Sequence, residues 1–388
     1  MSRASCDLAI IGGGIAGLWL LNLARRQGYS AVLIERDRLG GGQTLASQGM
    51  IHGGIKYTLN GALSAASETI ASMPGRWLRC LSGESESDPD LRQVRLLSNE
   101  YFLFSDGRLS SKLTAFFGSK AIQGRVENLQ AAELPPFFRH EAFRGLVYRL
   151  QDVVIDTPSL VKTLAAAGQP AIYTGNYTLN TGDPQNPVIE LEDGQSIGPK
   201  QLILAAGEGN GELITRLGLP LTMQLRPLNQ VVVKSAQLPG LYAHAVSLKS
   251  ADKPRLTITS HESDKGRTAW YLGGQLAESG VERSDPDQIS MARRELAVFF
   301  PWLDLEDAEF STLRINRAEA GQGNGQRPDT PFAEQFGNII VCWPTKLTLA
   351  PLLGDEVMRL LGSPGNMAPI SFKEAPQIGN YPWEEPDA

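Results

Sequence analysis

The N-terminal segment 7–17, DLAIIGGGIAG, constrains the fold of this chain more than any other part of it. Residues 7–11 form a short apolar run typical of a buried strand, and a GxGxxG spacing of glycines follows at once. The next segment, 18–26, has the apolar content of a helix, and AVLIE at 31–35 is typical of a second buried strand. The pattern predicts a βαβ unit, and therefore an α/β protein with a Rossmann-like domain at its N-terminus.

The three motif glycines, Gly12, Gly14 and Gly17, have separate physical tasks in a dinucleotide-binding unit. The first permits a tight turn, the second lets a pyrophosphate approach the backbone, and the third lets the helix pack close to the strand. Glu35 ends the second strand, where a carboxylate accepts hydrogen bonds from both ribose hydroxyls and disfavours NADP. The alternative is a glycine-rich surface turn, with Glu35 as a solvated strand end.

Composition excludes several classes of protein. The chain has 388 residues, 42% of them hydrophobic, and a net charge of −6, so it can bury a large core but lacks the basic character of a nucleic-acid binder. No apolar run is long enough to span a membrane, and a peripheral membrane contact stays open. The three cysteines show neither metal-site spacing nor a disulfide framework, which favours a reducing, cytoplasmic location: Cys6, Cys80 and Cys342.

Two kinds of sequence pattern alternate along the rest of the chain. Segments 159–167 and 349–361 predict helices, and 201–207 and 338–343 predict buried strands of the same α/β domain. Between them, the stretches at 94–109 and 226–274 alternate apolar and polar residues, as half-buried antiparallel strands do. The tail from residue 362 is polar and contains prolines, so we expect it to be poorly ordered.

The interleaving predicts one domain built from discontinuous pieces, with a mainly antiparallel β-sheet domain inserted into it. We place the nucleotide-binding domain at 1–80, 145–222 and 325–388, and the substrate domain at 81–144 and 223–324.

The chain resembles the FAD-dependent oxidoreductases of the D-amino-acid oxidase superfamily in five segments that keep the family's order. They are the N-terminal unit, GGGQTLASQGMIHGGIKY at 40–57, LVYRLQDVVIDTPSLVKTLAAAG at 146–168, IELEDGQSIGPKQLILAAGEGN at 189–210 and NIIVCWPTKLTLAPLLGDEVMRLL at 338–361. The IHGGIKY part is most similar to the glycerol-3-phosphate and hydroxyglutarate enzymes. The resemblance implies bound FAD rather than NAD.

The resemblance also implies which residues contact FAD. Its second flavin segment runs along the ribityl and pyrophosphate part of the cofactor, where glycines allow close approach and Gln43, Thr44 and Ser47 offer hydrogen bonds. His52 is expected near the flavin ring, as a substrate base, a flavin-orienting group or a covalent attachment point; a packed structural histidine is the alternative. The remaining expected contacts are Ile15, Ala16, Arg36, Gln48, Gly49, Met50, Ala206, Gly207, Leu347 and Thr348.

The substrate side is expected at the turn WPTKLTL, 343–349, where the relatives have a glycine-rich turn instead. Lys346 is the candidate charge that stabilises reduced flavin, with an exposed loop lysine as the alternative. Of the two arginines in STLRINR, the resemblance favours Arg314 over Arg317 for binding an anionic group, with a surface ion pair as the alternative. Lys56, Tyr57 and Tyr271 are further residues expected within reach of the pocket.

These features lead to an FAD-dependent dehydrogenase or oxidase acting on a small anionic substrate: a 2-hydroxy acid, a polyol phosphate or an amino acid. Its electron acceptor is oxygen, a quinone or a carrier protein. The alternatives are a flavoprotein subunit for electron relay or assembly, a flavin enzyme that modifies a macromolecule such as tRNA, and a plain NAD dehydrogenase. The acidic net charge weighs against the macromolecular alternative.

Overall fold

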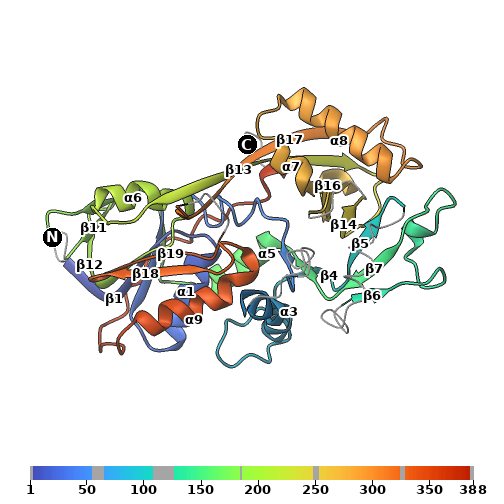
Figure 1. Cartoon of the computed structure of the whole chain (residues 1–388). Helices are drawn as coiled ribbons and strands as arrows, with labels where there is room; N and C mark the ends of the chain where they lie inside the picture. The colour runs from blue at the N-terminus through green and yellow to red at the C-terminus, as the bar shows by residue number, and fades with distance from the viewer. Residues whose placement is uncertain are drawn as a thin grey trace.

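The computed structural model describes residues 3–54, 65–107, 126–183, 186–247, 253–323 and 328–384. Two large sheets organise these residues into two lobes, shown at the left and right of Figure 1. Lys56 and Tyr57 lie outside the described residues.

The first lobe is built on an eight-stranded sheet whose central pairs are parallel. Its strands, in spatial order, are β10 (Tyr177–Asn180), β11 (Val188–Leu191), β12 (Ser196–Leu204), β1 (Arg3–Ile11), β2 (Ala31–Glu35) and β9 (Ile172–Thr174), with β19 (Ile339–Trp343) beside β12 and β18 (Phe332–Phe336) beside β19. The central strands are buried along most of their length, which explains their continuous apolar sequence.

Five helices within the described residues belong to this lobe: α1 (Ile15–Arg26), α3 (Ala65–Ser82), α5 (Thr157–Gly168), α6 (Asn210–Arg216) and α9 (Ala350–Leu360). Of these, α1 contacts both α5 and α9 (Figure 1). The predicted helices and strands of this lobe exist, with ends shifted by a few residues. Because α1 begins at Ile15 rather than Leu18, Gly17 lies in its first turn.

The second lobe is an eight-stranded sheet whose pairs are antiparallel except for one. Its strands, in spatial order, are β17 (Glu309–Ala320), β13 (Met223–Ser235), β16 (Thr268–Gly273), β15 (Leu256–Glu262), β14 (Ala243–Val246), β5 (Tyr101–Ser105), β7 (Val147–Leu150) and β6 (Val126–Asn128), and β14 pairs with β5 in parallel. Two helices, α7 (Gln275–Ser279) and α8 (Asp285–Phe299), belong to this lobe. Helix α8 contributes side chains to a hydrophobic core rich in phenylalanine and tryptophan. A third, small sheet has β8 (Val153–Ile155) between β3 (Met50–Ile51) and β4 (Leu96–Ser98).

The predicted domain boundaries differ from the packing at two places. Leu91 and Val94 belong to the hydrophobic core of the first lobe, although segment 81–144 was assigned to the substrate domain. Conversely, β7 lies in the second sheet, although it follows the expected boundary at residue 145. The sequence could not place these boundaries because short buried runs look alike whichever core they join.

The expectation of a poorly ordered tail is wrong for residues 362–384. The tail forms two backbone hydrogen bonds with Leu39. Leu39 N donates to the Gln377 carbonyl at 2.9 Å, and Gly379 N donates to the Leu39 carbonyl at 3.0 Å. Tyr381 is buried, and Trp383 stacks on it with ring centroids 4.6 Å apart. The tail is therefore packed against the body of the protein, despite its polar composition.

Candidate cofactor and substrate site

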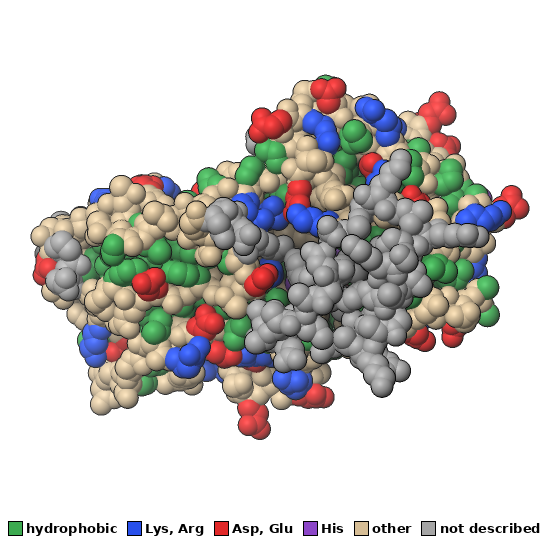
Figure 2. Space-filling model, viewed as in Figure 1, with side chains coloured by type: hydrophobic (Ala, Val, Ile, Leu, Met, Phe, Trp, Pro, Cys, Tyr) green, Lys and Arg blue, Asp and Glu red, His purple; other side chains and the backbone are tan. Residues whose placement is uncertain are grey.

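A cavity of about 780 Å³ opens at the carboxyl ends of β1, β2, β12 and β19, where open α/β sheets bind ligands. The strands β13 and β17 of the second lobe form its opposite wall. On the face seen in Figure 2, basic and acidic side chains lie next to each other where the two lobes meet. The volume is in the range of cofactor sites. No group of three or more histidine, cysteine, aspartate or glutamate side chains suited to a metal ion occurs among the described residues.

The glycines of the fingerprint are required by close backbone approaches. Gly12 has φ +113°, and a Cβ there would lie 2.6 Å from the carbonyl oxygen of Ala205. A Cβ on Gly17 would lie 1.9 Å from the carbonyl oxygen of Gly12, so only glycine lets α1 start this close to β1. Gly12 and Gly14 line the cavity, whereas Gly17 supports the turn from behind. The turn at Gly12 and the close packing at Gly17 are as expected from the sequence, and the approach of a pyrophosphate to Gly14 stays a prediction.

The N-terminus of α1 is suited to a pyrophosphate. Its N-cap residue is Gly14, whose missing side chain makes no cap, and no acidic residue lies in the first turn. Ile15 N donates to Thr44 Oγ1 at 2.9 Å. The first turn otherwise presents backbone N–H groups and the positive end of the helix dipole to the cavity. Thr44 therefore holds the helix start, in addition to lining the cavity.

The predicted ribose ligand, Glu35, also lines the cavity. Its carboxylate accepts from Gly13 N at 2.6 Å and from Asp37 N at 3.1 Å, so it is fixed at the end of β2. Arg36, by contrast, does not line the cavity. It points toward α6, where it is 3.7 Å from Glu212 and 5.8 Å above the ring of Tyr177.

The second flavin segment, which the resemblance implies runs along FAD, lines the cavity. Ser47 Oγ donates to the Thr44 carbonyl at 2.8 Å, which shapes the loop. Gln48 Nε2 donates to the carbonyls of Thr257 and Tyr271 at 3.1 and 2.8 Å, which ties this loop to the second lobe. The predicted contacts that line the cavity are Gly12, Gly14, Ile15, Ala16, Glu35, Gln43, Thr44, Ser47, Gln48, Gly49, Met50, His52, Ala206, Gly207, Lys346, Leu347 and Thr348.

His52 and Lys346 both line the cavity, and Thr348 connects the segments that carry them. His52 is buried, and its backbone N–H donates to Thr348 Oγ1 at 3.2 Å. The Lys346 side chain is 3% exposed, and its Nζ is 3.3 Å from the Asp329 carbonyl oxygen and 3.7 Å from Asp329 Oδ1. Lys346 is therefore not an exposed loop lysine, the alternative that the sequence left open.

The bulky turn after β19 does not fill the cavity. Trp343 is buried, and its indole N–H donates to the Gly207 carbonyl at 2.9 Å. Thr345 has φ +58°, a conformation that is strained for a β-branched residue. The turn thus folds back on Gly207, and its residues line the cavity.

Arg314 does not line the cavity, although its predicted role in binding an anionic group requires it to do so. Its guanidinium is half exposed and donates to the carbonyl oxygens of Val281 and Arg283 at 2.8 and 2.7 Å, with Asp285 at 3.3 Å. The side chain therefore fastens β17 to the segment before α8.

Three arginines of the described residues line the cavity: Arg38, which follows β2, Arg226 on β13 and Arg317 on β17. Arg226 and Arg317 are direct partners in the antiparallel register of their strands. Arg226 is ion-paired with the buried Glu319, and Arg317 stands 3.7 Å from Glu278. Sequence reasoning missed Arg226, because the pairing of two strands about 90 positions apart is not visible in a single sequence.

Tyr271 lies behind the wall rather than in it. Its hydroxyl is 2.9 Å from the Ala46 carbonyl and 2.5 Å from Gln230 Oε1, and burial raises its pKa well above the ordinary value. It joins β16 to the flavin segment and supports Gln230, which lines the cavity.

Comparison with known proteins agrees with this geometry. The family described as FAD dependent oxidoreductase (DAO) matches residues 7–360. A probable FAD-dependent oxidoreductase of Pseudomonas aeruginosa is 46% identical over 384 residues, covering 98% of this chain and 97% of the relative. The crystal structure of an FAD-dependent oxidoreductase from that organism superimposes with a TM-score of 0.83 at 40% identity, over 99% of each chain.

Two more distant matches are proteins whose names state an activity. Glycerol-3-phosphate dehydrogenase of Pseudomonas tolaasii is 37% identical over 308 residues, or 73% of this chain and 56% of that protein. Glycine oxidase of Geobacillus kaustophilus shares the fold, with a TM-score of 0.67 at 17% identity over 92% of this chain and 95% of that one.

An enzyme class follows from the fold, the cradle at α1 and these matches. The chain belongs to the family of FAD-dependent oxidoreductases, and its cofactor is FAD. Within the described residues, none of the helices combines the length and apolar character needed to cross a membrane.

Proposed function

We propose that this enzyme oxidises a small anionic substrate, a 2-hydroxy acid, a polyol phosphate or an amino acid, whose acidic group binds at Arg226 and Arg317. The observation that carries the proposal is the placement of these two arginines opposite each other on the cavity wall. Guanidinium groups suit carboxylates and phosphates because their planar forks form two parallel hydrogen bonds. The similarity to a glycerol-3-phosphate dehydrogenase and to a glycine oxidase fold is compatible with either kind of anion.

The cofactor fits the fingerprint half of the cavity, as the helix terminus, the glycine contacts and Glu35 indicate. When bound, FAD supplies the two-electron acceptor for the substrate carbon. Arg226 and Arg317 orient the substrate by its anionic end. His52, on the cavity wall, accepts the proton that the hydroxyl or ammonium group loses. The buried Lys346 ammonium places positive charge at the end of the cavity where reduction adds negative charge.

The electron-relay alternative rested on the bulky turn at 343–348. Because Trp343 packs under Gly207 and the cavity retains an arginine-lined wall, the site has room for a substrate, which favours the enzymatic proposal. The electron acceptor, whether oxygen, a quinone or a carrier protein, is identified by adding each to the substrate-reduced enzyme.

An anaerobic titration with matched compounds tests the proposal. The holoenzyme is mixed with glycerol 3-phosphate or glycerol, with 2-hydroxy acids or their amides, and with amino acids or their amides. We expect flavin absorbance to bleach with one class that carries the acidic group and to stay unchanged with the analogue of that class that lacks it. Equal bleaching by both members of a pair would contradict recognition of the anion. Flavin that no compound bleaches would favour electron relay or a macromolecular substrate.

A further inference from the structure

The turn that carries Lys346 is held in a strained shape. Lys346 N donates to the Pro344 carbonyl at 2.6 Å, which closes a three-residue turn centred on Thr345. Thr345 has a positive φ of 58°, which a β-branched residue rarely adopts without external support. Such strain persists only where the surrounding structure over-determines the conformation. The contacts that hold the next residues therefore also fix where the Lys346 ammonium lies.

Thr348 makes the contacts that support this turn. Its Oγ1 accepts from His52 N at 3.2 Å and lies 3.3 Å from the Met50 carbonyl, so it ties the turn to the second flavin segment. Its carbonyl oxygen accepts from the indole N–H of Trp77 at 2.9 Å. Trp77 is fully buried on α3, which is separate in sequence from both of the cavity segments that Thr348 joins.

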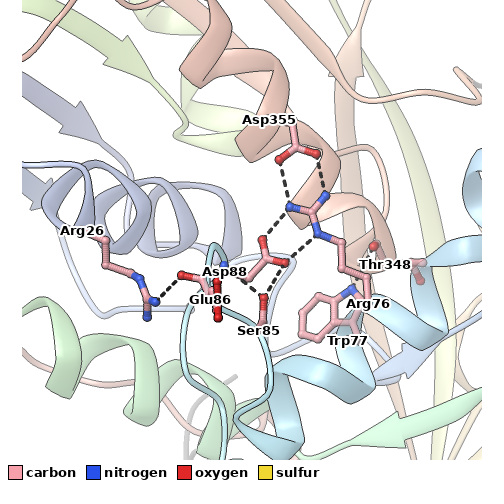
Figure 3. A network of polar contacts seen from close by, with 8 residues as sticks. All are labelled: Arg26, Arg76, Trp77, Ser85, Glu86, Asp88, Thr348 and Asp355. Atoms are coloured by element: carbon pink, nitrogen blue, oxygen red, sulfur yellow. Dashed lines mark hydrogen bonds and ion pairs between the residues drawn. The ribbon is translucent and has the colours of Figure 1, made fainter.

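Helix α3 is itself anchored next to Trp77. Arg76 Nε and Nη2 are 2.8 and 2.5 Å from the two carboxylate oxygens of Asp88, and its Nη1 and Nη2 are 2.5 and 2.9 Å from those of Asp355 (Figure 3). Asp355 lies on α9, the helix that begins immediately after the turn. Figure 3 shows Arg76 and Trp77 reaching α9 and Thr348 from the same turn of α3. Helix α3 thus contacts both the end of the turn, at Thr348, and the helix that follows it, at Asp355.

We propose that Trp77 is a positioning residue for the flavin site: its hydrogen bond to the Thr348 carbonyl, on a helix fixed by Arg76, keeps the strained turn in the shape that directs Lys346 at the cofactor. The proposal rests on the proposed placement of the flavin ring beside His52 and Lys346. A buried ammonium stabilises the reduced, more negative cofactor more than the oxidised one. Loosening the turn should therefore make the bound flavin harder to reduce.

Trp77→Phe and Trp19→Phe form a matched pair. Both indoles are fully buried in one core, with ring centroids 5.0 Å apart, and each substitution removes the same atoms. Trp19 Nε1 has no hydrogen-bond partner among the described residues, whereas Trp77 Nε1 holds Thr348. Cavity formation is therefore common to both variants, and loss of the turn contact is specific to W77F.

The measurement is the midpoint potential of the bound FAD, with the visible spectrum and the Kd for oxidised FAD recorded alongside. We expect W77F to weaken the binding of reduced FAD about tenfold relative to the binding of oxidised FAD. For a two-electron couple this corresponds to a midpoint potential lower by about 30 mV. W19F should keep the wild-type potential. Equal potentials in W77F and W19F would overturn the proposal. A wild-type protein without flavin would contradict the cofactor placement itself.

Asp355→Asn provides a second test if W77F does not fold. Asp355 is half exposed, so the substitution weakens the tie between α3 and α9 without opening the core. Removing a negative charge by itself raises a flavin potential, whereas loosening the turn lowers it. A lower potential in D355N supports the positioning role, and an unchanged or higher potential overturns it.

Discussion

Arg226 and Arg317 occupy directly opposed positions on β13 and β17, where like charges lower sheet stability. Glu319 and Glu278 offset part of this cost, the first through a paired contact with Arg226 and the second at 3.7 Å from Arg317. A costly charge pair on a cavity wall is expected where the charges serve a ligand. At the residue scale, this pair is the strongest sign of an anion-binding function.

Replacement of Arg317 tests that function against a neighbour on the same strand. We expect Arg317→Gln to raise KM for the anionic substrate about 10- to 100-fold, because one hydrogen-bonded charge contact contributes about 1.5–3 kcal/mol. Arg314→Gln is the control, since its side chain faces the α8 segment outside the cavity. Steady-state kinetics with the substrate found by titration measure both. A similar rise in KM for the two variants would contradict the assignment of Arg317.

The choice between these arginines shows what the sequence allowed at this scale. Residues 314 and 317 are an odd number apart, so the extended strand β17 directs them to opposite faces, and only one of them lines the cavity. The sequence did not indicate which one, because the orientation of β17 depends on its pairing with β13. The fingerprint glycines were predictable because their spacing is a local motif, although the atoms that require glycine at position 12 belong to Ala205 and Ala206, far along the chain.

At the scale of single elements, the start of α1 determines how the cofactor can be held. Gly17 lies in the first helical turn, directly against the Gly12 carbonyl, so the helix axis is fixed by a contact between two backbones. The N–H groups that this orientation presents are the ones expected to bind the pyrophosphate. A side chain at position 17 would shift the whole helix, not only one contact.

Gly17→Ala should weaken FAD binding about 10- to 100-fold, because a Cβ 1.9 Å from the Gly12 carbonyl forces a shift comparable to core overpacking, about 1–3 kcal/mol. Gly75→Ala on α3 is the matched control. It is exposed, its nearest neighbour would be 3.9 Å away, and alanine favours a helix interior by about 0.5–1 kcal/mol. Titration of the apoproteins with FAD gives both dissociation constants. Wild-type affinity in G17A would show that the helix start tolerates displacement.

Helices and strands of the nucleotide-binding lobe were predictable because their apolar periodicity is local. The second lobe was predictable only as a mainly antiparallel sheet. The order of its strands includes one parallel pair, β14 with β5, which joins segments about 140 residues apart. Periodicity indicates that a strand buries one face, but it does not indicate which strand lies beside it.

At the scale of the whole molecule, the C-terminal tail connects the two lobes. The Tyr381 hydroxyl donates to Asp156 Oδ1 at 2.8 Å and accepts from His261 Nδ1 at 3.0 Å. Asp156 caps α5 in the first lobe, and His261 lies on β15 in the second. The sequence did not predict this connection, because a polar, proline-containing tail resembles a disordered one until its few aromatic residues find partners.

The buried histidine of this connection makes stability depend on pH. Burial lowers the pKa of His261 from 6.5 to about 3, so the folded protein keeps it neutral while the unfolded chain binds a proton below pH 6.5. The unfolded state then binds more protons, and stability falls as the pH drops from about 6.5 toward 3, by about 1.4 kcal/mol per pH unit. The pKa of Asp156 is also lowered: burial raises it, but hydrogen bonds from Tyr381, Arg95 and Ser159 outweigh that effect, so its contribution is lost at still lower pH.

Denaturant unfolding at pH 7.5 and pH 5.5, with FAD at saturation, separates the contribution of His261 from that of Tyr381. The stability advantage of the wild type over His261→Gln should shrink by about 1.4 kcal/mol between these pH values, because only the wild type must exclude a proton from this site. Tyr381→Phe should be less stable than the wild type by about 1–3 kcal/mol at both values, since it leaves Asp156 and His261 without their shared partner. It should keep the wild-type pH dependence, because His261 stays buried. If the free energy of unfolding changed equally with pH in the wild type and in H261Q, exclusion of a proton from His261 would be contradicted.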